Sequence, residues 1–98
     1  MFTKEILEAD IAVCRGIIAG VGKYDGEWEF DARGMYVCPG LIDSHVHIES
    51  SMVTPVEFAK TILPHGTTTV IADPHEIANV CGINGIHYML KNTRDLPL

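Results

Sequence analysis

Two histidines separated by a single residue, His45 and His47, form a pattern suited to binding a metal ion. On a β-strand, residues two apart point from the same face with Cα atoms about 6.6 Å apart, and Ile42, Val46 and Ile48 would share the opposite, apolar face. Two imidazoles so placed can converge on one ion, as at zinc sites with metal–nitrogen distances of about 2.0–2.1 Å. An HxH triplet also arises by chance, as surface histidines or a hydrogen-bonded core histidine. Here both histidines lie on the polar face of a predicted strand, which favours metal binding over these alternatives.

Two carboxylates flank the histidine pair. Asp43 shares the polar face of the strand and could accept the far N–H of a ligating histidine, or it could be exposed near the start of the strand. Glu49 completes an H-x-E triplet with His47, which is half of the signature of cytidine-type zinc deaminases. The other half, P-C-x-x-C, does not occur in the sequence, so that family is excluded. Glu49 is either a pocket residue beside the metal or the first polar residue of a solvated loop.

A second ionisable cluster, Asp73, His75 and Glu76, follows a β-branched run at residues 67–72. Such a nearly continuous run is typical of a parallel strand that is covered on both faces. The carboxyl ends of the strands carry the chemistry in βα barrels. We therefore predict that the three residues contact substrate or metal rather than forming an ordinary loop.

Three other reactive side chains have simpler structural interpretations. His65 lies beside a predicted helix end, where it can bond the last carbonyls and complement the helix dipole. His87 lies inside a predicted helix and is interpreted as a packing or surface residue. Cys81 is interpreted as a small buried residue, because nothing nearby marks it as a nucleophile.

The elements that must position these residues alternate between strands and helices. Thr54 and Glu57 form a capping box, with Pro55 in the first turn, that marks the start of a helix. The predicted order is a strand at 41–48, a helix at 55–63, a strand at 67–72, a helix at 83–91, and the approach to a third strand at 95–98. This order predicts two consecutive βα units of a parallel sheet.

Before residue 39 the sequence has short apolar runs, at 11–14 and 17–21, separated by turns that contain glycine. Aromatic and acidic residues alternate at 28–32, as in a strand that is buried on one face. We therefore expect two or three antiparallel strands in residues 1–38, and a different domain in residues 39–98. A sheet this small is poorly stable alone, so we expect it to pack on another structure.

Length and composition narrow the possible functions. A chain of 98 residues is too short for a complete eight-unit α/β barrel of about 250 residues, and its hydrophobic content of 47% is typical of globular proteins. Thirteen acidic and seven basic residues give a net charge of −6, which disfavours nucleic-acid binding. Three cysteines form no CxxC pair, and neither a signal peptide nor a membrane segment is indicated. We expect a cytoplasmic location and no membrane partner.

The segment PGLIDSHVH, at residues 39–47, resembles the first barrel strand of the amidohydrolase superfamily. The segments HIESSM (47–52) and LPHGTTTVIADPHEIANV (63–80) are narrower and resemble its bacterial and archaeal adenine deaminase family. The resemblance implies an α/β fold, with the first two βα units of an amidohydrolase-type TIM barrel after part of a small β-sandwich domain. The chain would then be an N-terminal fragment, and the missing strands would carry the other metal ligands.

The resemblance also implies a reaction, the metal-dependent hydrolytic deamination of adenine to hypoxanthine and ammonia in purine metabolism. A divalent metal, manganese or iron with zinc as the alternative, would make water more acidic, and an acid would protonate the leaving ammonia. His45 and His47 map onto metal ligands. The remaining pocket candidates have no fixed role: Glu49, Asp73, His75 and Glu76. The implied partner is the small molecule adenine, and the full-length enzyme is expected to be a homo-oligomer.

Two other functions stay open. The first is a different amidohydrolase that acts on a cyclic amide and shares the HxH strand. Release of ammonia from adenine, rather than opening of a cyclic amide, distinguishes the two enzymes. The second is a non-catalytic remnant that binds a metal or a partner. An unfinished sheet with an exposed strand edge argues against the second.

We predict that the isolated 98-residue chain has little or no deaminase activity. Two histidines and two of about eight strands do not complete a catalytic site, because catalytic zinc, for comparison, takes about three protein ligands and a water. Ammonia release from adenine by the purified chain is the measurement. Turnover that is abolished by His45→Ala would contradict this prediction.

Overall fold

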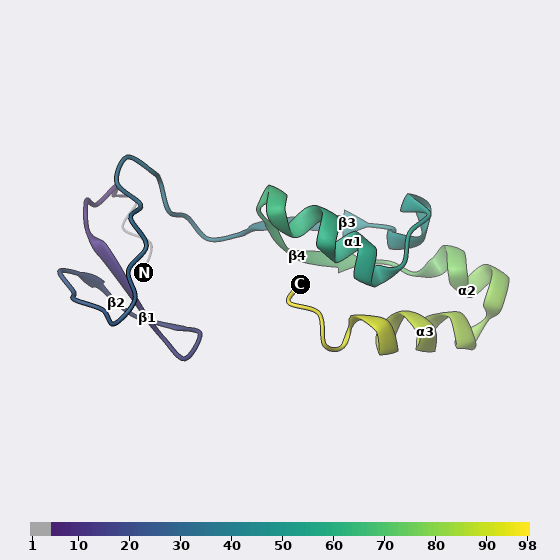
Figure 1. The fold of residues 1–98 in the computed structure, drawn as a ribbon. Coiled ribbons are helices and arrows are strands. Elements are labelled where there is room, and N and C mark those ends of the chain that lie inside the picture. The colour runs from purple at the N-terminus through teal and green to yellow at the C-terminus, as the bar shows by residue number, and fades with distance from the viewer. Residues whose placement is uncertain (1–4) are drawn as a thin grey trace. The chain divides into compact units, whose positions relative to one another are not determined.

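The computed structural model describes residues 5–98, and the chain divides into two compact units between Tyr36 and Val37 (Figure 1). The elements are β1 (Asp10–Cys14), β2 (Ile17–Gly22), β3 (Leu41–Val46), η1 (Ile48–Ser51), α1 (Pro55–Ile62), η2 (Leu63–His65), β4 (Thr67–Ala72), α2 (His75–Cys81) and α3 (Ile83–Thr93), where η marks a 3-10 helix. Strands β1 and β2 belong to the first unit and all the other elements to the second. The predicted mixture of helices and strands is confirmed.

Strands β1 and β2 form an antiparallel hairpin that reverses direction at Arg15 and Gly16. Both residues have a positive φ, 52° and 76°, as required by the tight turns that match the twist of paired strands. At the start of β1, a carboxylate oxygen of Asp10 accepts a hydrogen bond from the N–H of Tyr24 at 3.2 Å. The first two predicted strands are therefore confirmed.

The third strand predicted in this unit, at residues 28–32, does not form. Within residues 5–36 the aromatic side chains of that segment have no cover, since Trp28 is 91% exposed and Phe30 83%. The carboxylate of Asp31 instead accepts hydrogen bonds from the backbone N–H and the guanidinium of Arg33. The guanidinium, and then the backbone bond, hold the pKa of the Asp31 carboxyl below its usual value. Alternation alone does not make a strand without a partner strand.

In the second unit, β3 and β4 are parallel neighbours connected through η1, α1 and η2. Leu41 pairs with Thr67 at one end, and Val46 pairs with Ala72 at the other. Strand β4 has the bounds predicted from its β-branched sequence. The first βα unit is confirmed, and the carboxyl ends of both strands lie at the same edge.

The faces of this two-stranded sheet differ from the prediction. Strand β3 ends at Val46, and Ile48 begins η1, where it is only 2% exposed. Ile42 is 67% exposed, so the three predicted residues do not form one continuous buried strand face. Ile71 of β4 is 60% exposed, because no element of residues 37–98 covers that side. The predicted cover on both faces of β4 is therefore wrong for the described residues.

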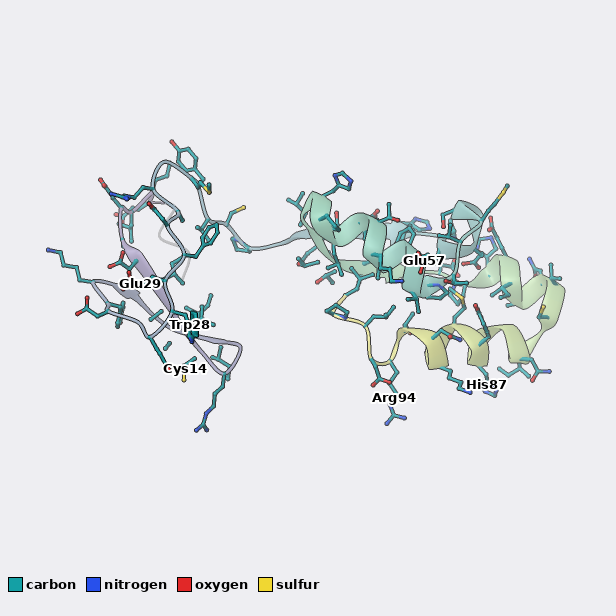
Figure 2. All side chains as sticks on the ribbon, in the orientation of Figure 1. Cys14, Trp28, Glu29, Glu57, His87 and Arg94 are labelled. Carbon is teal, nitrogen blue, oxygen red and sulfur yellow. The ribbon has the colours of Figure 1, made fainter. Side chains whose placement is uncertain are left out.

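Helix α1 begins as predicted, with Pro55 in the first turn and the Thr54 hydroxyl accepting the N–H of Glu57 at 3.4 Å. The carboxylate of Glu57 (Figure 2) accepts a hydrogen bond from Lys60 Nζ at 2.7 Å. It does not return to the N–H of Thr54. Only one half of the predicted capping box forms, because the lysine one turn later competes for the carboxylate.

The core of the second unit lies where η1, α1 and α3 meet. Its buried members are Ile48, Pro55, Ala59 and Met89. Helix α3 confirms the predicted second helix and ends at Thr93, two residues later than expected. Among residues 5–98, every helix is too short or too polar to cross a lipid bilayer.

Helix α2 is an addition to the predicted order, and it packs closely on α3. A Cβ atom at Gly85 of α3 would lie 2.7 Å from the carbonyl oxygen of Ile77 in α2, so only glycine allows this approach. Cys81 is exposed, and its predicted burial is wrong. Helix α2 ends at this cysteine, whereas α3 approaches the earlier turn at Ile77.

We expect Gly85→Ala to lower the free energy of unfolding by about 1–3 kcal/mol, since the added methyl group would force α2 and α3 apart. Asn84→Ala is the matched control, because Asn84 is exposed and lies one position earlier on the same helix. Urea or thermal unfolding measures both variants. Equal stability of the two would show that the helices are not in close contact.

Candidate metal centre

The carboxyl ends of β3 and β4 bring two distant segments together. Val46 faces Ala72, and the N–H of Asp73 donates to the carbonyl of Val46 at 3.1 Å. His47 directly follows β3, and Asp73 directly follows β4. The two predicted clusters of ionisable residues therefore meet at one edge of the sheet, as expected for parallel strands.

A bulge in β3 precedes this edge. Three residue steps of β3, from Asp43 to Val46, face only two steps of β4, from Val70 to Ala72. His45 lies in the bulge, and its backbone N–H donates to Oδ1 of Asp43 at 3.1 Å. Bulges re-aim side chains and are common next to active sites. Asp43 thus supports the backbone of His45.

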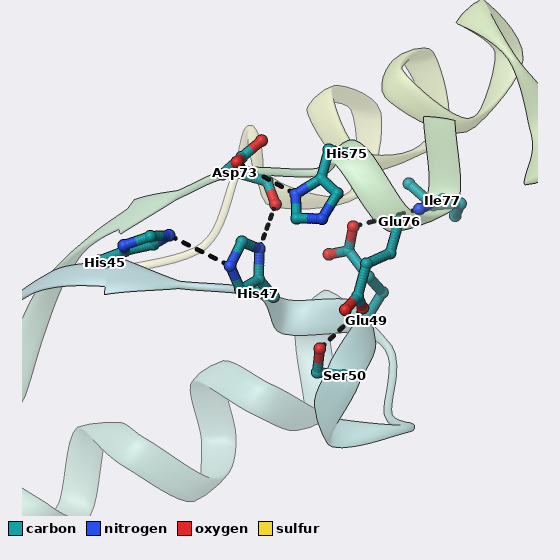
Figure 3. Close-up of polar contacts among 8 residues, drawn as sticks. All are labelled: His45, His47, Glu49, Ser50, Asp73, His75, Glu76 and Ile77. Atoms are coloured by element: carbon teal, nitrogen blue, oxygen red, sulfur yellow. Dashed lines mark hydrogen bonds and ion pairs between the residues drawn. The ribbon is translucent and has the colours of Figure 1, made fainter. Parts of the chain in front are cut away.

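The rings of His45 and His47 point toward each other (Figure 3), with their Nε2 atoms 3.1 Å apart. Nδ1 of His47 lies 2.8 Å from the backbone carbonyl of Asp73. A carbonyl oxygen only accepts hydrogen bonds, so Nδ1 of His47 carries the proton. In neutral His47, Nε2 then has a lone pair that faces His45.

This geometry fits a metal ion. Two nitrogens at about 2.1 Å from a tetrahedral ion would be about 3.4 Å apart, close to the separation of the two Nε2 atoms. A carboxylate oxygen of Asp73 completes a group of three ligand atoms that all lie within 4.8 Å of one another. A histidine ligand commonly donates its other N–H to a carbonyl, as His47 does. His45, His47 and Asp73 could therefore hold a divalent cation.

Asp73 also has a second neighbour. Its Oδ2 lies 3.1 Å from Nδ1 of His75, and both side chains are more than half exposed. The rings of His47 and His75 meet edge to face, with centroids 4.7 Å apart and planes at 86°. Asp73 thus links the histidine pair to His75, in a position open to solvent.

The other two predicted pocket residues hold η1 and α2 together. Oε1 of Glu49 accepts the backbone N–H of Ile77 at 3.2 Å, and Oε2 of Glu76 accepts the hydroxyl proton of Ser50 at 2.7 Å. Figure 3 shows the two carboxylates beside each other between these elements. Glu49 is half-buried, so the alternative of a solvated loop residue is not what the structure shows.

Sequence reasoning missed two contributors. Ser50 was not singled out, because a serine after an acidic residue is common, and its only signal was its place beside Glu49. The carbonyl of Asp73, and not the predicted carboxylate of Asp43, accepts the far N–H of His47. The exposed histidines His65 and His87 do not belong to the cluster.

Comparison with known protein families matches the part of the chain that carries the histidine pair. The sequence pattern of the amidohydrolase family matches residues 36–98. The chain belongs to the amidohydrolase family. This confirms the superfamily expected from the segment around His45 and His47.

Curated relatives match the whole chain and carry the name adenine deaminase. The chain is 62% identical to the protein of Geobacillus kaustophilus over 98 residues, 62% to that of Kosmotoga olearia over 99, and 57% to that of Bacillus subtilis over 98. The matched part is 100% of this chain and 17% of each relative. The likeness to this group, predicted from two sequence segments, is confirmed.

We expect His45→Ala and His47→Ala each to weaken binding of a divalent metal by about a hundredfold or more, since even the outer partners of metal ligands are worth about 10–100-fold. His87→Ala is the control, because His87 is an exposed histidine of α3 (Figure 2). Competition with a coloured chelator measures affinity in the complete gene product. A loss of affinity in the His87 variant equal to that in the other two would argue against this centre.

Proposed function

We propose that this chain supplies the first metal ligands of an adenine deaminase, which hydrolyses adenine to hypoxanthine and ammonia. The convergence of His45 and His47 at the end of β3, with Nε2 atoms 3.1 Å apart, carries the proposal. Membership of the amidohydrolase family and the name of the relatives, adenine deaminase, support adenine as the substrate.

The proposed ligands are His45 and His47, with Asp73 within reach. A mixed set of imidazole and carboxylate donors suits manganese, iron or zinc, and we propose manganese or iron. When bound, such an ion supplies the nucleophile by making water more acidic. The bond from His47 Nδ1 to the Asp73 carbonyl keeps Nε2 of His47 available as a ligand.

Proton transfer is proposed for His75, with Asp73 as the hydrogen-bond partner of its ring. Replacement of the amino group at C6 of adenine needs a base for the attacking water and an acid for the leaving ammonia. Asp73 and His75 share a hydrogen bond, are both exposed, and lie beside His47. Glu49 and Glu76 are instead held by the donors of Ile77 and Ser50, and they remain proposed pocket residues through those contacts.

We propose that residues 39–98 begin the barrel domain of a TIM-barrel enzyme, and that residues 1–38 belong to a small β-sandwich domain. The parallel pair β3 and β4, connected through α1, supports the first assignment, and the antiparallel hairpin of β1 and β2 supports the second. The proposed enzyme is a cytoplasmic homo-oligomer of purine metabolism. Its partner is the free base adenine rather than nucleic acid, which the net charge of −6 supports.

We expect the complete gene product to release ammonia from adenine in a metal-dependent way. Chelation should abolish the activity, and manganese or ferrous iron should restore it, because the ion generates the nucleophile. His45→Ala should lower kcat/KM by about a hundredfold or more. An ammonia assay with adenine and a ring-opening assay with a cyclic amide decide the substrate. Opening of the cyclic amide without reaction of adenine would point to a different amidohydrolase, and metal binding without either reaction would point to a non-catalytic protein.

A further inference from the structure

Two hydrogen bonds connect η1 to the first turn of α2, next to the candidate metal centre (Figure 3). One runs from the N–H of Ile77 to Oε1 of Glu49 at 3.2 Å, and the other from the hydroxyl of Ser50 to Oε2 of Glu76 at 2.7 Å. They join residues 28 and 26 positions apart in the sequence. We call these four residues the η1–α2 clasp.

The first bond supplies a helix cap that α2 lacks locally. The first N–H groups of a helix have no partners within the helix, and the residue before it often provides an acceptor. Pro74 occupies that position in α2 and makes no side-chain cap. Glu49 accepts the N–H of Ile77, the third residue of α2, in its place. Its negative charge also complements the helix dipole.

The clasp fixes the part of α2 that faces the metal centre. His75 is the first residue of α2, and its ring lies edge-on to the ring of His47. Asp73 lies two residues earlier and contacts His47 through its carbonyl and His75 through its carboxylate. A shift of the start of α2 would therefore move the partners of His47 as well.

Stabilisation of the fold alone does not explain the clasp. Oε2 of Glu49 is buried and has no hydrogen-bond partner among the described residues, and a buried polar atom without a partner costs free energy. The neighbouring Ser51 shows the ordinary alternative, because its hydroxyl donates to the carbonyl of Ile48 within its own turn. Ser50 reaches across to α2 instead.

We propose that Glu49 and Ser50 are positioning residues for the metal centre, acting through the first turn of α2 on Asp73 and His75. The inference rests on the proposed function, since it requires that His45 and His47 bind the metal. It assigns to Glu49 a place in the site other than contact with metal or substrate. It also assigns a positioning role to Ser50, whose hydroxyl donates to Glu76.

The test compares the metal affinity of four variants of the complete gene product, measured by chelator competition. Ser50→Ala and Glu49→Ala each remove one bond and should weaken affinity by up to about tenfold, which is the lower end of the loss for direct partners of metal ligands, because both residues act one contact further out. Glu49→Gln keeps an oxygen acceptor for Ile77 and should restore affinity close to that of the unchanged protein. Ser51→Ala is the matched control in the same turn, and it should leave the metal affinity unchanged.

Thermal unfolding of each metal-free variant separates positioning from mere stabilisation. Ser50→Ala decides the test if Glu49→Ala does not fold, because the Ser50 side chain is exposed. Unchanged metal affinity in folded Ser50→Ala protein, with or without a lower Tm, would overturn the inference.

His45→Ala serves as the reference for the proposed function. If it loses affinity while the clasp variants retain it, only the clasp inference fails, and if it retains affinity, the proposed metal centre itself is wrong.

Discussion

The hydrogen bond from Nδ1 of His47 to the carbonyl of Asp73 is the interaction on which the candidate centre depends. It exists because β3 and β4 are parallel and end opposite each other, at Val46 and Ala72. It leaves the lone pair of Nε2 directed at His45, and it places the Asp73 carboxylate within reach of the same point. One backbone acceptor thus sets the tautomer of a proposed ligand, the orientation of its ring and the place of a third candidate donor.

Charge makes the same edge of the sheet favourable for a cation. Three carboxylates gather there, those of Glu49, Asp73 and Glu76, and like charges in one place repel each other. Each carboxylate has one donor in contact, which is a backbone N–H, an imidazole or a hydroxyl. The backbone N–H and the hydroxyl carry no charge to cancel those of Glu49 and Glu76, and carboxylates gathered at one edge attract cations.

Elements whose signals lie within a short stretch of sequence were predicted correctly. Strand β4 follows its β-branched run, and α1 starts at the Thr54 cap. Two of the failures involve contacts between distant residues. Residues 28–32 alternate like a strand but lack a partner, and the cap of α2 comes from Glu49, 28 residues before Ile77. No pattern within a short window contains such a partner.

The sequence predicted which residues meet at the candidate site but not the hydrogen bonds between them, and the bulge of β3 explains the difference. Strict alternation places Asp43, His45 and His47 on one face, which suggested Asp43 as the partner of a ring. His45 lies in the bulge, where the register of β3 against β4 shifts, and its N–H donates to Asp43 instead. The ring partner must then come from another strand. The parallel register supplies it as a backbone carbonyl, an atom that every residue carries and that no sequence motif can mark.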